Sequence, residues 1–227
     1  MNVCLQRCAH HRCSAIYPCI ENISNRISSW KNIWRNIKRA KNSGIFIKDD
    51  DNDHHFRQLY AIHQKRMREI GAKPLPLKLL EGIRRHLTNA GYGSFSYAFE
   101  GERLIGGALC VGLNRVMDYF MGAFDSDYGK SQPNSLLMYH MITYARDHGY
   151  HFWNWQSASS PQSGVYHYKA GWGSRDGRHY YLTRVIEDIT GFKKVPQQVI
   201  KEKYGWHYVM PYRELSISHS MPKGQEI

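Results

Sequence analysis

Residues 163–173 read Ser-Gly-Val-Tyr-His-Tyr-Lys-Ala-Gly-Trp-Gly, a stretch that sets one lysine among aromatic residues and glycines. We expect a short helix over residues 163–170. A lysine held between aromatic side chains can stabilise an oxyanion or bind a phosphate. The ordinary alternative is a solvent-exposed lysine. The surrounding pattern makes Lys169 the first candidate for a catalytic residue.

Its neighbours supply further candidates. Tyr166 and Tyr168 present large faces with a polar tip, which suits the walls of a substrate cleft. Trp172 is expected to pack against a sheet. His167 is a candidate general base because imidazole titrates near neutral pH, although it alternates with the tyrosines as a simple surface residue would.

Periodicity outlines the elements on both sides of this stretch. The predicted segments are helices over residues 22–42, 53–70, 77–90 and 134–148, strands over residues 44–48, 94–99, 104–113, 115–123 and 150–156, and, after the short helix, a strand over residues 179–185 and a helix over residues 192–203. Asn134 is the expected N-cap of its helix. The residues from 49 to 53, mostly aspartates, are expected to form a solvated loop.

Three patches carry a family resemblance. In residues 56–74, Phe-x-x-Leu-Tyr leads to Met-Arg-Glu-Ile-Gly and a proline. In residues 133–150, Pro-Asn-Ser-Leu-Leu opens a helix that ends in Ala-Arg-Asp-His-Gly-Tyr. The third patch is the opening stretch. Together they resemble the FemAB-like branch of the GNAT acyltransferase superfamily, and the likeness extends over residues 35–182.

The resemblance implies an α/β (α+β) fold with a GNAT-like mixed, mostly antiparallel sheet flanked by helices. Family members usually carry two GNAT-like halves. We therefore expect a poorly ordered leader with Cys and His over residues 1–21, and a helix and strand that remain from a first half over residues 22–48. The acyltransferase domain itself is expected over residues 49–216, followed by a tail over residues 217–227.

One strand departs from the family pattern. Where relatives read aromatic-Asp-Phe-Gly-Arg-Ser, residues 153–158 read Trp-Asn-Trp-Gln-Ser-Ala. The carboxylate and the arginine are absent, so Asn154 and Gln156 are the candidates for substrate binding here. This departure implies altered acceptor specificity or weakened activity.

Other candidates bind anions. Arg66 and Arg68 could hold an acceptor's phosphate in a bidentate fork, or belong to a solvated helix face. Asn134 and Ser135 open a helix whose free N–H groups favour an anion, or form a plain helix start. No Gly-x-Gly phosphate loop precedes them, since residues 129–132 read Gly-Lys-Ser-Gln. Coenzyme A binding of the usual kind is therefore unsupported.

The charge also indicates an anionic partner. With 31 Lys and Arg against 19 Asp and Glu, the net charge is +12. Such a surplus suits RNA, phosphorylated carriers, coenzyme A or an acidic membrane face; a DNA partner is not expected. No apolar run is long enough to cross a membrane, and no secretory signal is recognised. A cytoplasmic location follows, with peripheral membrane contact left open.

Four of the five cysteines precede residue 20, close to His10 and His11. Thiolates and imidazoles together can bind zinc, but the spacing repeats no knuckle, so incidental cysteines are expected and no metal site is predicted. Cys110 lies in an apolar strand and is expected to be buried.

The leading hypothesis is an N-acyltransferase that moves an acyl or aminoacyl group onto an amine of a cell-wall or exopolysaccharide precursor. Its donor would be acyl-CoA or an aminoacyl-tRNA, with no tightly bound cofactor. The alternative is a truncated, non-catalytic protein of the same fold that binds such precursors. A basic RNA-binding protein would show steep salt dependence, but the chain has no recognised RNA-reading motif.

Overall fold

The computed structural model describes residues 3–6, 15–16, 31–156, 164–174, 181–184, 190–196 and 198–200. The chain divides into two compact units. One consists of Cys13–Gly177, and the other combines Met1–Arg12 with Arg178–Ile227. The predicted domain boundaries remain predictions.

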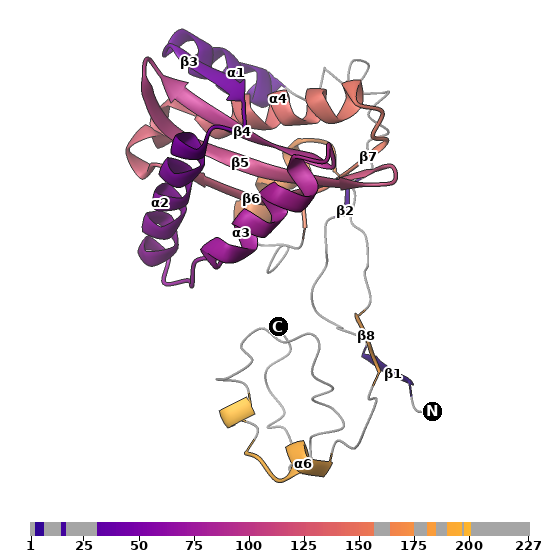
Figure 1. The fold of residues 1–227 in the computed structure, drawn as a ribbon. Helices are drawn as coiled ribbons and strands as arrows, with labels where there is room; N and C mark the ends of the chain where they lie inside the picture. The colour runs from indigo at the N-terminus through magenta and orange to yellow at the C-terminus, as the bar shows by residue number, and fades with distance from the viewer. Residues whose placement is uncertain are drawn as a thin grey trace. The chain divides into compact units, whose positions relative to one another are not determined.

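A six-stranded sheet forms the centre of the larger unit, in the order β2-β7-β6-β5-β4-β3 (Figure 1). The strands are β2 (Ala15–Ile16), β3 (Ile45–Asp49), β4 (Gly93–Glu100), β5 (Arg103–Leu113), β6 (Val116–Phe124) and β7 (Phe152–Asn154). All neighbours run antiparallel except β6 and β7, which are parallel. The expected GNAT-like mixed, mostly antiparallel sheet flanked by helices is confirmed.

Helices α2 (Asp53–Glu69) and α3 (Leu77–Ile83) cover one face of the sheet (Figure 1). Phe56 and Leu59 of α2 are buried in the same cluster as Phe95. Helix α2 approaches the sheet closely at Gly107, where an added Cβ would lie 2.6 Å from a strand carbonyl and 3.2 Å from the Leu59 side chain. A glycine at this position allows the helix to pack tightly onto β5.

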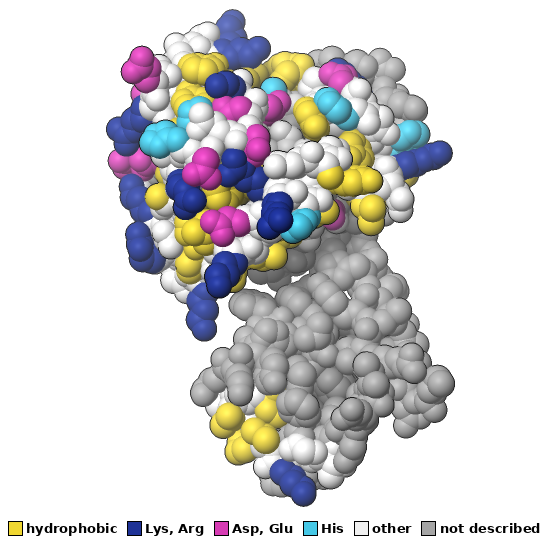
Figure 2. Space-filling view, viewed as in Figure 1, with side chains coloured by type: hydrophobic (Ala, Val, Ile, Leu, Met, Phe, Trp, Pro, Cys, Tyr) yellow, Lys and Arg dark blue, Asp and Glu magenta, His cyan; other side chains and the backbone are white. Residues whose placement is uncertain are grey.

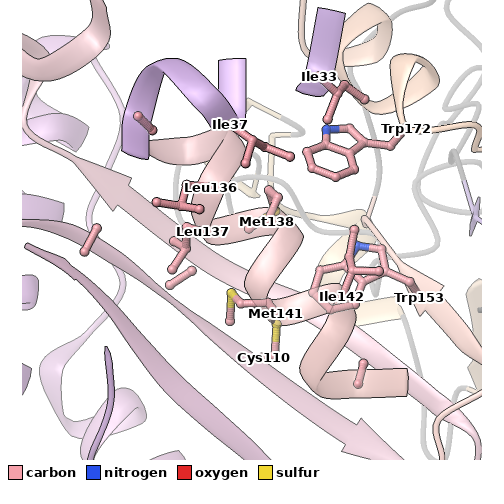
Figure 3. Packing of buried hydrophobic residues seen from close by; sticks show 14 of the residues in the cluster. Ile33, Ile37, Cys110, Leu136, Leu137, Met138, Met141, Ile142, Trp153 and Trp172 are labelled. Carbon is pink, nitrogen blue, oxygen red and sulfur yellow. Dashed lines mark hydrogen bonds between the residues drawn. The ribbon is translucent and has the colours of Figure 1, made fainter. Parts of the chain in front are cut away.

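The opposite face is covered by α1 (Lys31–Asn42) and α4 (Pro133–Asp147), as Figure 3 shows from close by. Buried residues of this second cluster include Ile33 and Ile37 of α1, Leu137 and Met141 of α4, and Trp172. The predicted helix over residues 22–42 is confirmed from Lys31 onward, and its first part lies outside the described residues. Cys110 is buried here as expected, and burial raises the pKa of its thiol.

Two helix predictions need correction. Helix α4 begins at Pro133, and its N-cap is Gln132 in the left-handed region with φ 59°, so Asn134 is not the cap. A proline suits the first helical position because its missing N–H has no intrahelical acceptor there. The predicted helix over residues 77–90 ends as an α-helix at Ile83 and continues as a π-helical turn over Arg84–Thr88.

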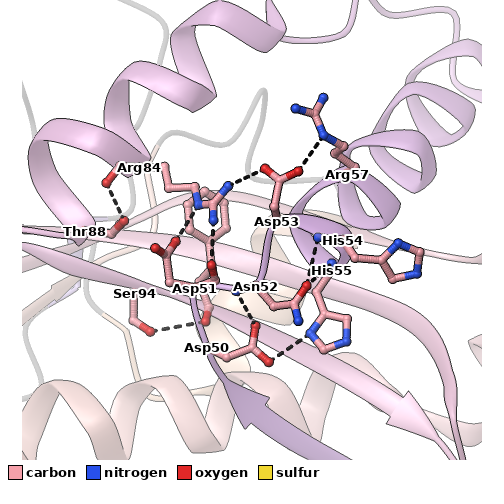
Figure 4. A network of polar contacts seen from close by, with 11 residues as sticks. Asp50, Asp51, Asn52, Asp53, His54, His55, Arg57, Arg84, Thr88 and Ser94 are labelled. Carbon is pink, nitrogen blue, oxygen red and sulfur yellow. Dashed lines mark hydrogen bonds and ion pairs between the residues drawn. The ribbon is translucent and has the colours of Figure 1, made fainter.

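The aspartate-rich loop before α2 is a loop as expected, but it carries a polar network rather than simple solvation (Figure 4). Arg84, from the π-helical turn, pairs with the carboxylates of Asp51 and Asp53. The Asn52 side chain accepts hydrogen bonds from the backbone N–H groups of His54 (2.8 Å) and His55 (3.4 Å). The loop thus caps α2 and ties it to the end of α3.

The smaller unit contains β1 (Val3–Gln6), which pairs antiparallel with β8 (Tyr181–Arg184), and helix α6 (Thr190–Lys193). The predicted strand over residues 179–185 is confirmed in its described part. The predicted helix over residues 192–203 is interrupted: residues 192–193 are the end of α6, residues 194–196 are not helical, and residues 198–200 are helical again. Pro196 accounts for this, since the residue before a proline avoids helical angles.

Among the residues that the structure describes, no helix is long and apolar enough to cross a membrane. The side chains of the four N-terminal cysteines lie outside the described residues, so the prediction that they bind no metal stays untested.

Asn52→Ala removes the side-chain cap of α2. We expect the free energy of unfolding to fall by about 1 kcal/mol, because two N–H groups lose their acceptor. Chemical denaturation measures the change, with Asn42→Ala at the end of α1 as the matched control. Equal stability of the two variants would show that the cap is not used.

His63 of α2 predicts a pH dependence of stability. Its Nε2 accepts a hydrogen bond from the Leu75 N–H at 3.0 Å, and burial lowers the pKa of the imidazole. The stabilising contribution is therefore complete above the unfolded pKa of about 6.5 and is lost as the pH falls through the lower folded pKa. The free energy of unfolding should fall less between about pH 7.5 and about pH 5 in His63→Gln, which keeps an acceptor, than in the unsubstituted protein. An identical fall in both proteins, measured by chemical denaturation, would contradict this role.

Candidate active site

The two parallel strands of the sheet, β6 and β7, part from each other. Pairing between β6 and β7 runs only from Val116 with Phe152 to Asp118 with Asn154, whereas β6 continues along β5 to Phe124. The register of β5 and β6 shifts between Leu109 and Cys110, which marks a β-bulge. Bulges re-aim side chains next to functional sites, and the gap between the parted strands is the candidate site.

Two hollows meet at this gap. One has a volume of about 280 Å³ and the other of about 530 Å³. Both are lined by Tyr119 of β6, Asn134 of α4 and Val165 of α5 (Gly164–Gly171). We call the two together the β6–β7 cleft. A separate groove of about 380 Å³ lies at the outer edge of the sheet, where Ile45 and Ile47 of β3 face Tyr139 of α4.

Lys169 lies in the β6–β7 cleft although only 6% of it is exposed. Its Nζ donates a hydrogen bond to the carbonyl oxygen of Gln156 at 3.3 Å. Helix α5 holds the backbone of Lys169, whose carbonyl accepts from the Ser174 hydroxyl at 2.7 Å. A buried lysine is rare unless it is paired, so this side chain differs clearly from a solvated surface lysine.

Tyr168 lines the same part of the cleft. Burial raises the pKa of its phenol, and the neighbouring polar side chains of Trp172, Ser135 and Asn134 oppose that rise. The structure therefore brings four of the predicted site residues together: Asn134, Ser135, Tyr168 and Lys169. Trp172 packs in the core as expected, with its ring 5.9 Å from that of Trp155.

Asn154 and Gln156 shape the end of β7. The Asn154 Oδ1 accepts a hydrogen bond from the Gln156 N–H at 3.1 Å. Gln156 has φ 62°, a left-handed conformation that favours glycine. Glycine is the residue that the resembling family's pattern has at this position. The contact of Gln156 with Lys169 comes from its backbone carbonyl rather than from its side chain.

The remaining candidates lie apart from this group. His167 is exposed, with its ring centroid 5.7 Å from that of Tyr166, and neither residue is among those that line the β6–β7 cleft. Arg68 is exposed on α2 and does not line the cleft. Arg66 does line the larger hollow, where its guanidinium pairs with Glu69 at 2.9 Å.

Tyr119 is a site residue that the sequence pattern did not reveal. It lines both hollows, and burial raises the pKa of its phenol. The Trp155 ring meets it edge-on at 5.9 Å. A Cβ at Gly122 would lie 1.8 Å from the Tyr119 hydroxyl, so this glycine leaves room for the ring. The only sequence signal for Tyr119 was a glycine three residues after a tyrosine in a predicted strand. The β-bulge between them breaks the alternation of inward-facing and outward-facing side chains from which strand faces are predicted.

The start of α4 offers few donors to a phosphate. Pro133 has no N–H, and the Ser135 N–H already donates to the Gln132 carbonyl at 3.1 Å. A helix N-terminus binds pyrophosphate through several free N–H groups. This geometry agrees with the missing Gly-x-Gly loop.

Basic charge is concentrated on α1, which carries exposed lysine and arginine side chains and no acidic residue. Its exposed basic residues are Lys31, Arg35, Lys38, Arg39 and Lys41. In contrast, basic and acidic side chains alternate on the face of α2 and α3 that Figure 2 shows, where Arg57 pairs with Asp53. An anionic macromolecule would therefore find a more uniform surface on α1.

Comparisons with known proteins support the same fold. The model of the acetyltransferase (GNAT) domain family matches residues 28–170, while a search of curated proteins finds no significant match. FemX has a similar structure, with a TM-score of 0.59 and 15% identity over 78% of this chain and 61% of that chain. L-PGS from Bacillus licheniformis has a TM-score of 0.58 and 10% identity, and the match covers 84% of this chain and 63% of that chain. An aminoglycoside acetyltransferase from an uncultured soil metagenomic sample has a TM-score of 0.50 and 14% identity, and the match covers 64% of this chain and 99% of that chain.

The chain thus spans about three fifths of the length of the FemX and L-PGS structures, and identities this low show the fold alone. The family match covers more than half of the 227 residues. The chain therefore belongs to the acetyltransferase (GNAT) domain family, and its fold is similar to those of FemX and L-PGS.

Proposed function

We propose that the chain is an N-acyltransferase that moves an acyl or aminoacyl group onto an amine of a cell-wall or exopolysaccharide precursor. The observation that carries the proposal is the buried, oriented Lys169 in the cleft where β6 and β7 part. Membership of a family of acyltransferases supports the reaction class. The choice of precursor rests on the FemAB-like resemblance.

The chemistry of transfer suits the side chains of the cleft. A neutral amine attacks the donor's carbonyl carbon, a C–N bond forms, and the C–S bond of a thioester or the C–O bond of an ester breaks. The amine loses a proton and the leaving group gains one. The Lys169 ammonium can stabilise the oxyanion, and a phenol that stays protonated, at Tyr168 or Tyr119, can donate the proton.

Of the two donor classes, we propose an aminoacyl-tRNA rather than acyl-CoA, on two observations. The start of α4 offers few free N–H groups to a coenzyme A pyrophosphate, because Pro133 has none and the Ser135 N–H is already bonded. The basic face of α1 suits a polyanionic donor. Arg66 lines the larger hollow, which supports its proposed role in binding a phosphate of the acceptor. These donors are cytoplasmic, which fits the expected location.

Lys169→Met tests the proposal, because methionine keeps the length of the buried stem and removes the charge. We expect kcat/KM for transfer to fall by about a hundredfold or more, as on loss of one oxyanion donor. The measurement compares acyl-CoA and aminoacyl-tRNA pools as donors, with amine-bearing envelope precursors as acceptors. Lys78→Met, an exposed lysine of α3, is the matched control and should keep full activity.

Equal rates for the two variants would contradict a role for Lys169. Precursor binding without turnover in the unsubstituted chain would instead support the non-catalytic alternative.

A further inference from the structure

A carboxyl group next to the cleft has no part in the chemistry above. Asp118 of β6 is half-buried and lies in register with Asn154 of β7, at the last pair before the strands part. Its Oδ1 is buried and has no hydrogen-bond partner among the described residues. Because the two residues are partners in register, the Asn154 side chain is the polar group that lies beside this carboxyl. Buried carboxyl oxygens without partners are costly, so this arrangement calls for a role.

Asn154 joins this carboxyl to the next turn of the chain. Its Oδ1 already accepts the Gln156 N–H at 3.1 Å, so its amide nitrogen is the group that can donate toward the neighbouring Asp118 carboxyl. An amide can accept on one side and donate on the other, whereas an ionised aspartate only accepts. An aspartate at position 154 would therefore set two carboxylates against each other across the parallel strands.

The same hydrogen bond stabilises an unusual backbone. Gln156 adopts φ 62°, which costs free energy for any residue except glycine. The Asn154 side chain offsets that cost by bonding the Gln156 N–H. In this conformation the Gln156 carbonyl receives the Nζ of Lys169 at 3.3 Å. Hydrogen bonds therefore connect Asn154 through Gln156 to Lys169, and Asp118 lies beside Asn154 at the start of this series.

We propose that Asp118 is a positioning residue for Lys169: it orients the Asn154 amide, which holds the turn at Gln156 and so fixes the lysine ammonium in the β6–β7 cleft. The consequence for turnover rests on the proposed function, but the placement of the amine does not. The relay also gives a physical reason for an asparagine at position 154, where the resembling family has an aspartate.

The test exchanges the two groups. Asn154→Asp opposes two carboxylates, whereas the double variant Asp118→Asn with Asn154→Asp restores one donor and one acceptor in swapped places. The readout is the rate at which acetic anhydride modifies Lys169, followed by mass spectrometry of the folded full-length chain. Modification of Lys78 in the same sample and the variant Asp147→Asn, at the exposed end of α4, serve as controls.

We expect Asn154→Asp to raise the modification rate of Lys169 by about tenfold, because the hydrogen bond that the ammonium donates to the Gln156 carbonyl is released. The double variant should return within about twofold of the unsubstituted protein. Lys78 should react equally in all samples. An unchanged Lys169 rate in Asn154→Asp, or a raised rate that the double variant does not restore, would overturn the proposal.

A second pair covers the case in which Asn154→Asp does not fold. Asp118→Asn keeps an acceptor oxygen for Asn154, whereas Asp118→Leu has similar size and no acceptor. Faster modification of Lys169 in Asp118→Leu alone supports the relay, and equal rates in the two variants overturn it. Since neither readout needs transfer activity, failure of the proposed function would appear separately, as absent turnover with the modification pattern intact.

Discussion

The site depends on the point at which two parallel strands stop pairing. Pairing between β6 and β7 ends at Asp118 and Asn154. Beyond this point β6 is paired only with β5. Backbone groups that lose a strand partner must find other partners or face a ligand. The parting therefore creates an opening that the side chains of β6, α4 and α5 border. A fully paired sheet would place tightly packed side chains there instead.

Packed aromatic rings support one side of this opening. Trp155 lies between Trp153 and Trp172, with ring centroids 5.6 and 5.9 Å away, and Tyr168 meets Trp172 at 6.2 Å. These contacts join β7 to α5, so the short helix that carries Lys169 is held by the core. Eight residues would not form a stable helix on their own. The aromatic residues of the opening stretch thus serve two purposes, since Trp172 fixes the helix and Tyr168 lines the cleft.

The fold could be predicted from the sequence to a large extent, because its helices and strands have strong periodicity and clear breaks. Glycines and prolines marked most element ends within a few residues. Errors arose where local rules compete: Pro133 moved the start of α4 one residue earlier, and the π-helical turn after Ile83 replaced the end of a regular helix. Neither feature changes the hydrophobic pattern, so periodicity could not reveal them.

The site was less predictable, since it depends on contacts between distant segments. The opening stretch identified Lys169 and Tyr168, and the helix start identified Asn134, yet nothing in either segment indicates Tyr119 or Asp118. Those residues reach the site through the bulge and the register of β6, which are tertiary features. His167 and Tyr166 remain predictions; they do not line the cleft, because a helix turns adjacent residues to different faces.

The central claim is that transfer takes place in the β6–β7 cleft. Hydrogen exchange of the full chain, with and without an aminoacyl-tRNA whose ester is replaced by an unreactive amide, tests it most directly. The account predicts slower exchange of backbone amides in residues 119–124, 134–138 and 164–169, which border the cleft. Slower exchange confined to residues 45–47 and 139–143, along the separate groove at the sheet edge, would contradict it.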